Sequence, residues 1–185
     1  MATSFGMSKS NEPLLVGMFD TREDAEKAYN ELKAMGYTSD DINVVMTSEG
    51  HDRHFKNVDG EDLGKTEMGN KALEGTGTGA TIGGITGGIA GAIAALGTNL
   101  IVPGLGMVIL GPLAAGLAGA GAGGLAGGII GALIGAGIPK EKAETFHKGL
   151  KEGNIMISVH PHDLNDATKI QERWREFSGH DIVYQ

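Results

Sequence analysis

Cysteine is absent from this chain of 185 residues. The sequence therefore excludes disulfide bonds, thiol nucleophiles and cysteine-based metal sites, and it fits a reducing compartment. Positive charge is scarce as well, because 15 Lys and Arg face 23 Asp and Glu and leave a net charge of −8. Proteins that bind nucleic acid depend on basic patches, so we expect no nucleic acid among the partners.

A secretion signal is also missing from the N-terminal region. Residues 1–13 are polar and contain neither an apolar core nor a cleavage pattern. The sequence predicts a short disordered tail here, and we expect a cytoplasmic protein that is not secreted.

Charged side chains are missing from residues 75–139, a block of 65 residues. Glycine is abundant there instead: of 32 glycines in the chain, 22 lie from Gly75 to Gly137. Average usage of about 7% predicts only about 13 glycines in a chain of this length. The block is thus distinct in composition from the ordinary globular sequence on either side of it.

Residues 14–47 carry a strand–helix–strand pattern. An apolar run at 14–19 predicts a buried strand. Thr21 with Asp24 forms a pair typical of a helix N-terminus, and Gly36 is placed to end that helix. A second apolar run at 42–46 predicts the next strand. Residues 48–74 are polar and predict a linker.

Residues 139–185 repeat the pattern in the order helix–strand–helix–strand. Pro139 is suited to the first turn of a helix, and strands are predicted at 154–159 and 181–184. The helix between them presents an apolar face that includes Trp174, which we expect in the core. Without the helix that starts at Pro139, the two flanking parts together give the β-α-β-β-α-β order of an α+β, ferredoxin-like (split βαβ) domain. Residues 75–138 would interrupt it between its second and third strands, which requires the insertion to double back as an α-helical hairpin.

Two glycine ladders with a spacing of four residues support that hairpin. Such spacing places glycines along one stripe of a helix, where a second backbone can approach closely. The predicted helix-packing interface comprises Gly75, Gly79, Gly83, Gly87, Gly91, Gly119, Gly123, Gly127, Gly131 and Gly135.

The stretch between the ladders is the most hydrophobic part of the chain and predicts an apolar tip. Its residues are Leu100, Ile101, Val102, Pro103, Leu105, Met107, Val108, Ile109 and Leu110. Three interpretations compete: a hairpin inserted in a membrane, a soluble assembly in which hairpins of many subunits bury one another, and a low-complexity disordered tract. Strict spacing with interleaved isoleucines argues against disorder. We favour membrane association over the soluble assembly and expect a homo-oligomer in both cases, with membrane lipids as the other candidate partner.

Chemistry of the kind that enzymes need is not apparent. His51, Asp52 and His54 form one candidate group of metal ligands, and His160, His162 and Asp163 form another. Neither has the spacing of a known zinc set, and solvated loop histidines are the simpler interpretation. We therefore expect no catalytic residues, no cofactor and no metal.

Several segments together resemble the bacterial general stress protein family (YflT-like, heat-induced), whose relatives are often called low-temperature-induced proteins. The likeness rests on residues 16–28 (VGMFDTREDAEKA), 36–45 (GYTSDDINVV), 137–139 (GIP) with the acidic helix that follows, and 154–162. With the glycine-rich middle it covers most of residues 14–185. The resemblance implies a stress-linked, non-enzymatic structural protein and supplies no catalytic residues.

Overall fold

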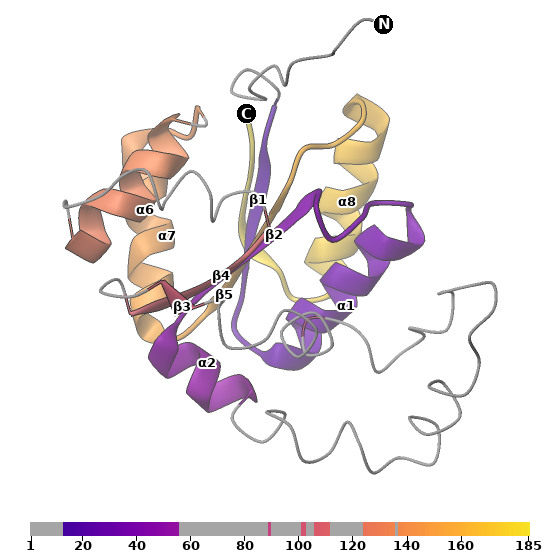
Figure 1. Ribbon diagram of the computed structural model, residues 1–185. Coiled ribbons are helices and arrows are strands. Elements are labelled where there is room, and N and C mark those ends of the chain that lie inside the picture. The colour runs from indigo at the N-terminus through magenta and orange to yellow at the C-terminus, as the bar shows by residue number, and fades with distance from the viewer. Residues whose placement is uncertain (1–12, 56–88, 90–100, 103–105, 112–123, 136) are drawn as a thin grey trace, which may run out of the picture.

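The computed structural model describes residues 13–55, 89, 101–102, 106–111, 124–135 and 137–185 (Figure 1). These residues form five helices and a six-stranded antiparallel sheet, which confirms a mixed α+β class. The strands are β1 (Leu15–Phe19), β2 (Ile42–Thr47), β3 (Ile101–Val102), β4 (Met107–Leu110), β5 (Ile155–Val159) and β6 (His180–Tyr184). The helices are α1 (Arg22–Ala34), α2 (Ser48–Phe55), α6 (Gly124–Gly135), α7 (Lys140–Glu152) and α8 (Leu164–Glu176).

The sheet has the strand order β3-β4-β2-β5-β1-β6. Strand β5 lies between β1 and β2 and is antiparallel to both, with Gly17 opposite Ile157 and Val44 opposite the same residue. β1 and β2 therefore run in the same direction. The C-terminal strand β6 adds to the other side of β1, and the short β4 adds to the outer side of β2.

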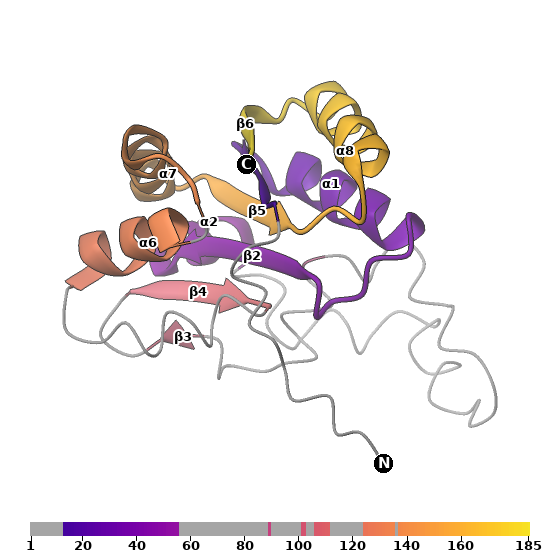
Figure 2. The same ribbon diagram turned by 90° about the horizontal axis from the view of Figure 1, so that it is seen from above.

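Helices cover both faces of the sheet (Figure 2), and each face has its own core. Helices α1 and α8 lie on one face, whereas α6 and α7 lie on the other. We call these the α1/α8 core and the α6/α7 core. Phe19 and Trp174 belong to the first, with their rings edge to face at 5.6 Å between centroids. Phe146 and Met156 belong to the second.

Local sequence signals place most of the helix ends. The Thr21 hydroxyl accepts a hydrogen bond from the Asp24 N–H at 3.2 Å, as the predicted N-cap requires. Gly36 and Gly153 follow α1 and α7 with φ of +97°, a conformation that glycine adopts without strain. Pro139 is the N-cap of α7, one residue before the position we expected. Trp174 is fully buried, as predicted.

The prediction of a linker over 48–74 is wrong for its first eight residues, which form α2. The Thr47 hydroxyl accepts a hydrogen bond from the Gly50 N–H at 3.0 Å and caps the helix start. Phe55 ends the helix in the α1/α8 core, with the Arg22 guanidinium 5.0 Å from its ring centroid. The rest of the predicted linker lies outside the described residues.

The prediction of a helical hairpin over 75–138 is wrong for the region of its apolar tip. Met107–Leu110 form β4, which pairs with β2 from Val44↔Leu110 to Thr47↔Met107. Ile101–Val102 form β3, which pairs with β4. The physical reason is the free outer edge of β2, which offers backbone hydrogen bonds to an apolar run. Leu100, Pro103 and Leu105 lie outside the described residues.

The apolar sequence of β4 is explained by its burial on both faces of the sheet. Val108 and Leu110 join the α1/α8 core, and Met107 and Ile109 join the α6/α7 core. Side chains of successive strand residues point to opposite faces. Met107–Leu110 of the predicted tip therefore find their apolar surroundings inside their own domain.

The two arms of the predicted hairpin also lie apart where the structure describes them. Ile89, from the first arm, is buried in the α1/α8 core. Ile129 and Leu133, from the second arm, are buried in the α6/α7 core. Because the sheet separates the two cores, these residues of the arms do not pack against each other.

Candidate functional site

Helix α6 is the part of the second glycine ladder that the structure describes. Its sequence, GLAGGIIGALIG, has no charged or hydrogen-bonding side chain. Ile129 and Leu133 are 3% and 1% exposed, and they pack with Phe146 and Leu150 of α7 and with the sheet. One side of the helix is thus fixed in the domain.

The opposite side of α6 faces outward, and we call its residues Gly131, Ile134 and Gly135 the outer face of α6. Both glycines are exposed, and among the described residues no heavy atom lies within 4 Å of a Cβ built on either. Ile134 is 43% exposed, so part of its apolar side chain is open to the exterior. The predicted packing stripe therefore exists at these two glycines, but it is open to the exterior.

One other member of the predicted interface lies among the described residues. Gly127 lies in α6, one turn before Gly131. The members outside the described residues are Gly75, Gly79, Gly83, Gly87, Gly91, Gly119 and Gly123.

Close backbone approach occurs instead at glycines that lie outside the ladders. A Cβ at Gly17 would stand 2.8 Å from the Trp174 ring, and a Cβ at Gly149 would stand 2.6 Å from Cε of Met18. Gly111 ends β4 with φ of +92°, and its Cβ would lie 2.2 Å from the Ile42 carbonyl oxygen. Spacing of glycines in the sequence could not identify these positions, because each is set by a partner distant along the chain.

The largest polar cluster joins the C-terminal end of α1 to the start of α8. The buried Tyr37 hydroxyl donates to Asp166 Oδ2 at 3.1 Å and accepts from the His162 N–H at 3.1 Å. The His162 ring stacks on Tyr37 at 4.3 Å and contacts the same Asp166 oxygen through Nδ1 at 3.1 Å. Burial raises the pKa of Tyr37 to about 12, so its hydroxyl stays protonated as a donor. The hydrogen bond from His162 lowers the pKa of Asp166, which keeps it ionised.

A second histidine is held between two carboxylates at the start of β6. His180 contacts Asp20 Oδ1 through Nε2 at 3.0 Å and Asp181 Oδ2 through Nδ1 at 2.9 Å. Burial lowers the pKa of His180, but its hydrogen bonds to the carboxylates of Asp181 and Asp20 outweigh that effect and the net pKa is raised. The first cluster fastens the segment before α8 to the segment after α1, and the second fastens the start of β6 to the turn before α1.

The histidines proposed as metal ligands have other roles. His51 is 8% exposed on α2 and its ring stacks with Phe55, so the interpretation of a solvated loop histidine is wrong there. His54 Nε2 lies 3.0 Å from the Gly153 carbonyl oxygen, and His160 Nδ1 lies 3.2 Å from that of Pro13. Among the described residues, no group of three or more His, Asp or Glu side chains could hold a metal ion.

Within the described ranges, none of the helices combines the length and the apolar character that a membrane crossing needs. No family model, no curated protein and no solved structure matches the chain.

Proposed function

We propose that this protein is a non-enzymatic structural protein that self-associates through the outer face of α6. The observation that carries the proposal is that Gly131 and Gly135 stand one helical turn apart with open space above both. Glycines at this spacing let two helix backbones come into close contact. In the proposed dimer contact, α6 of one copy packs against α6 of a second copy, so that the same face serves both partners.

The cost of keeping glycine in α6 supports a packing role. Each interior glycine destabilises a helix by about 0.8–1.0 kcal/mol relative to alanine. Alanine fits at Gly131 and Gly135 without meeting any atom within 4 Å. Neither glycine thus stabilises the isolated domain, whereas both would allow close contact with a second helix. Burying the exposed part of Ile134 in that contact adds roughly 1 kcal/mol per copy.

We propose further that the domain is ferredoxin-like and that the protein belongs to the general stress proteins that it resembles. The order β6-β1-β5-β2, with α1 and α8 on one face, supports the split βαβ arrangement. The stress-linked role rests on the resemblance of the flanking segments to that family.

Two environments for the assembly remain candidates. The burial of β4 in its own domain favours a soluble assembly, because the predicted tip no longer needs lipid around it. Membrane association through residues 75–138 is supported by the absence of charge over that segment and by the exposed Ile134. Flotation with vesicles of phosphatidylcholine and phosphatidylglycerol distinguishes them: protein at the bottom of the gradient supports the soluble assembly, and protein that floats supports the membrane.

The test of self-association is sedimentation velocity on the double variant Gly131→Leu, Gly135→Leu. We expect its oligomer to dissociate at concentrations where the parent protein stays assembled. The monomer fold should gain stability in the same variant, since leucine is the better helix former by about 0.8 kcal/mol per site. Lys148→Leu is the matched control, because it places the same side chain on an exposed face of α7. An unchanged oligomer in the double variant would overturn the proposal.

A further inference from the structure

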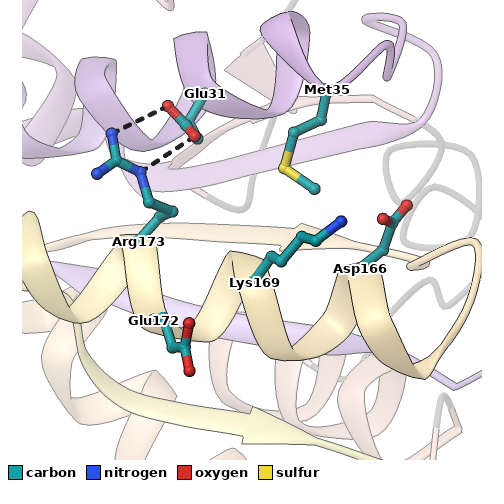
Figure 3. Close-up of a pocket in the computed structure, with 6 residues that line it drawn as sticks. All are labelled: Glu31, Met35, Asp166, Lys169, Glu172 and Arg173. Carbon is teal, nitrogen blue, oxygen red and sulfur yellow. Dashed lines mark hydrogen bonds and ion pairs between the residues drawn. The ribbon is translucent and has the colours of Figure 1, made fainter.

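A groove between α1 and α8 lies far from the outer face of α6, on the other side of the sheet (Figure 3). Its volume is about 360 Å³, and it is lined by Glu31, Met35, Asp166, Lys169, Glu172 and Arg173. Pockets for small ligands run from about 300 to 1,000 Å³. The groove therefore has room for a small molecule only.

One end of the groove is closed by an ion pair. Arg173 reaches from α8 to Glu31 of α1, with contacts of 3.1 and 3.4 Å to its two carboxylate oxygens. Its guanidinium also contacts Glu176 and lies 4.9 Å from the Phe177 ring centroid. The charge of Arg173 is thus already matched, and this pair forms a rigid wall.

The other end of the groove offers a carboxylate oxygen. Among the described residues, both hydrogen bonds to the Asp166 side chain, from Tyr37 and from His162, fall on Oδ2. Oδ1 is left for a donor that enters the groove. The same two contacts hold the carboxylate in place, so it is oriented before any ligand arrives.

Between the two ends, Lys169 provides an ammonium without a close counter-ion. It makes no ion pair within 4 Å with any part of the chain that the structure describes. Figure 3 shows its side chain in the groove beneath Met35. Asp166 and Lys169 are three residues apart on α8, a spacing that puts Cβ atoms about 5–6 Å from each other. One small ligand can contact both.

Met35 supplies the apolar surface of the groove. Its thioether is flexible and polarisable, and such side chains adapt to ligands of different shape. It also packs against the α1/α8 core, which anchors its stem.

We propose that this groove binds a small zwitterion of the α-amino acid class that has an apolar side chain. The ligand ammonium donates to Asp166 Oδ1, its carboxylate accepts from the Lys169 ammonium, and its side chain lies against Met35. The Lys169 ammonium and the Asp166 carboxylate then each meet a ligand group of opposite charge. This activity is separate from self-association and does not depend on it.

Ligand-detected saturation-transfer NMR on the full chain tests the proposal, and it tolerates a large assembly. The probes are L-leucine, its methyl ester, which lacks the carboxylate, and N-acetyl-L-leucine, which lacks the ammonium. We expect a saturable signal from leucine and at least a tenfold weaker affinity for each derivative. Absence of a leucine signal at millimolar concentration, or equal signals from all three probes, would overturn the proposal.

Two substitutions of exposed side chains locate the binding. Lys169→Met removes the ammonium and should abolish the leucine signal, whereas Lys148→Met, the same change on an exposed face of α7 across the sheet, should leave the signal intact. Circular dichroism confirms that both variants remain folded. Leucine binding that survives in Lys169→Met, or that disappears in Lys148→Met, contradicts the proposed site.

Discussion

Replacement of Ile109 by alanine should destabilise the whole α+β domain. Ile109 is 1% exposed in the α6/α7 core and lies opposite Val45 of β2. Removing a buried isoleucine side chain down to Cβ costs about 2–5 kcal/mol, and we expect about 3 kcal/mol here. Total stabilities of about 5–15 kcal/mol make this a large fraction. A loss of that size lowers the melting temperature by about 6–12 °C in a chain of this length.

The chain has a single tryptophan, which makes the assay specific. Trp174 lies in the α1/α8 core, on the opposite face of the sheet from Ile109, so its fluorescence during urea unfolding reports on the domain and not on the mutated position. Protein concentration is held fixed, because self-association shifts apparent stability.

Leu164→Ala is the control for the Ile109 variant, since Leu164 is 72% exposed and its loss should change stability by no more than about 0.5 kcal/mol. If residue 109 lay instead at a hairpin tip in lipid or between subunits, Ile109→Ala would leave the free energy of unfolding of the domain unchanged. An Ile109→Ala variant that unfolds together with the parent protein would therefore refute the assignment of β4 to the core.

Three further changes test other parts of the structure. Gly111→Ala should destabilise the domain by more than 1 kcal/mol in urea unfolding, because the residue has φ of +92° and a Cβ there meets the Ile42 carbonyl. Protonated His180 stabilises the fold below about pH 6.5, and this contribution is lost as pH rises through the raised pKa of His180. His180→Asn should therefore lower the free energy of unfolding at pH 5.5 more than at pH 8.5. An equal decrease at the two pH values would contradict this. His147→Phe should stabilise the fold relative to the parent protein as pH falls below about 6.5. Burial and the Lys151 charge lower the pKa of the His147 imidazole, so its protonation at low pH destabilises the native state. The ring nitrogens of His147 have no hydrogen-bond partner among the described residues.

Local chemistry made the flanking elements predictable. Helix caps and stops act over a few residues, so Thr21 and Gly36 could be recognised from their neighbours in the sequence. Alternating strands and helices then gave the mixed α+β class. The period of four glycines also predicted a helix where α6 is found.

Long-range pairing made β4 unpredictable. A short apolar run fits a buried strand as well as the connection between two helices, and its place between two glycine ladders favoured the tip of a helical hairpin. Only the free edge of β2, more than 50 residues away along the chain, decides between them. His51 shows the same limit: its burial depends on Phe55 being anchored in a core that the local sequence does not reveal.

The candidate groove could not be predicted from the sequence either. Glu31 and Arg173 are separated by 142 positions, and Tyr37 and Asp166 by 129. No motif links residues so far apart. The outer face of α6 was predictable as a glycine stripe, but its exposure was not, because that depends on which side of α6 packs against α7.

Disulfide crosslinking through a single introduced cysteine tests the central claim most directly, because the chain has no cysteine of its own. The claim is that α6 helices of two copies pack through Gly131 and Gly135. A disulfide needs Cα atoms about 4.4–6.8 Å apart, a distance that only backbone-to-backbone packing across the outer face provides. Oxidised Gly131→Cys should run as a covalent dimer, whereas Lys148→Cys on α7 should stay monomeric under denaturing conditions. A Gly131→Cys variant that crosslinks no better than Lys148→Cys would contradict self-association through this face.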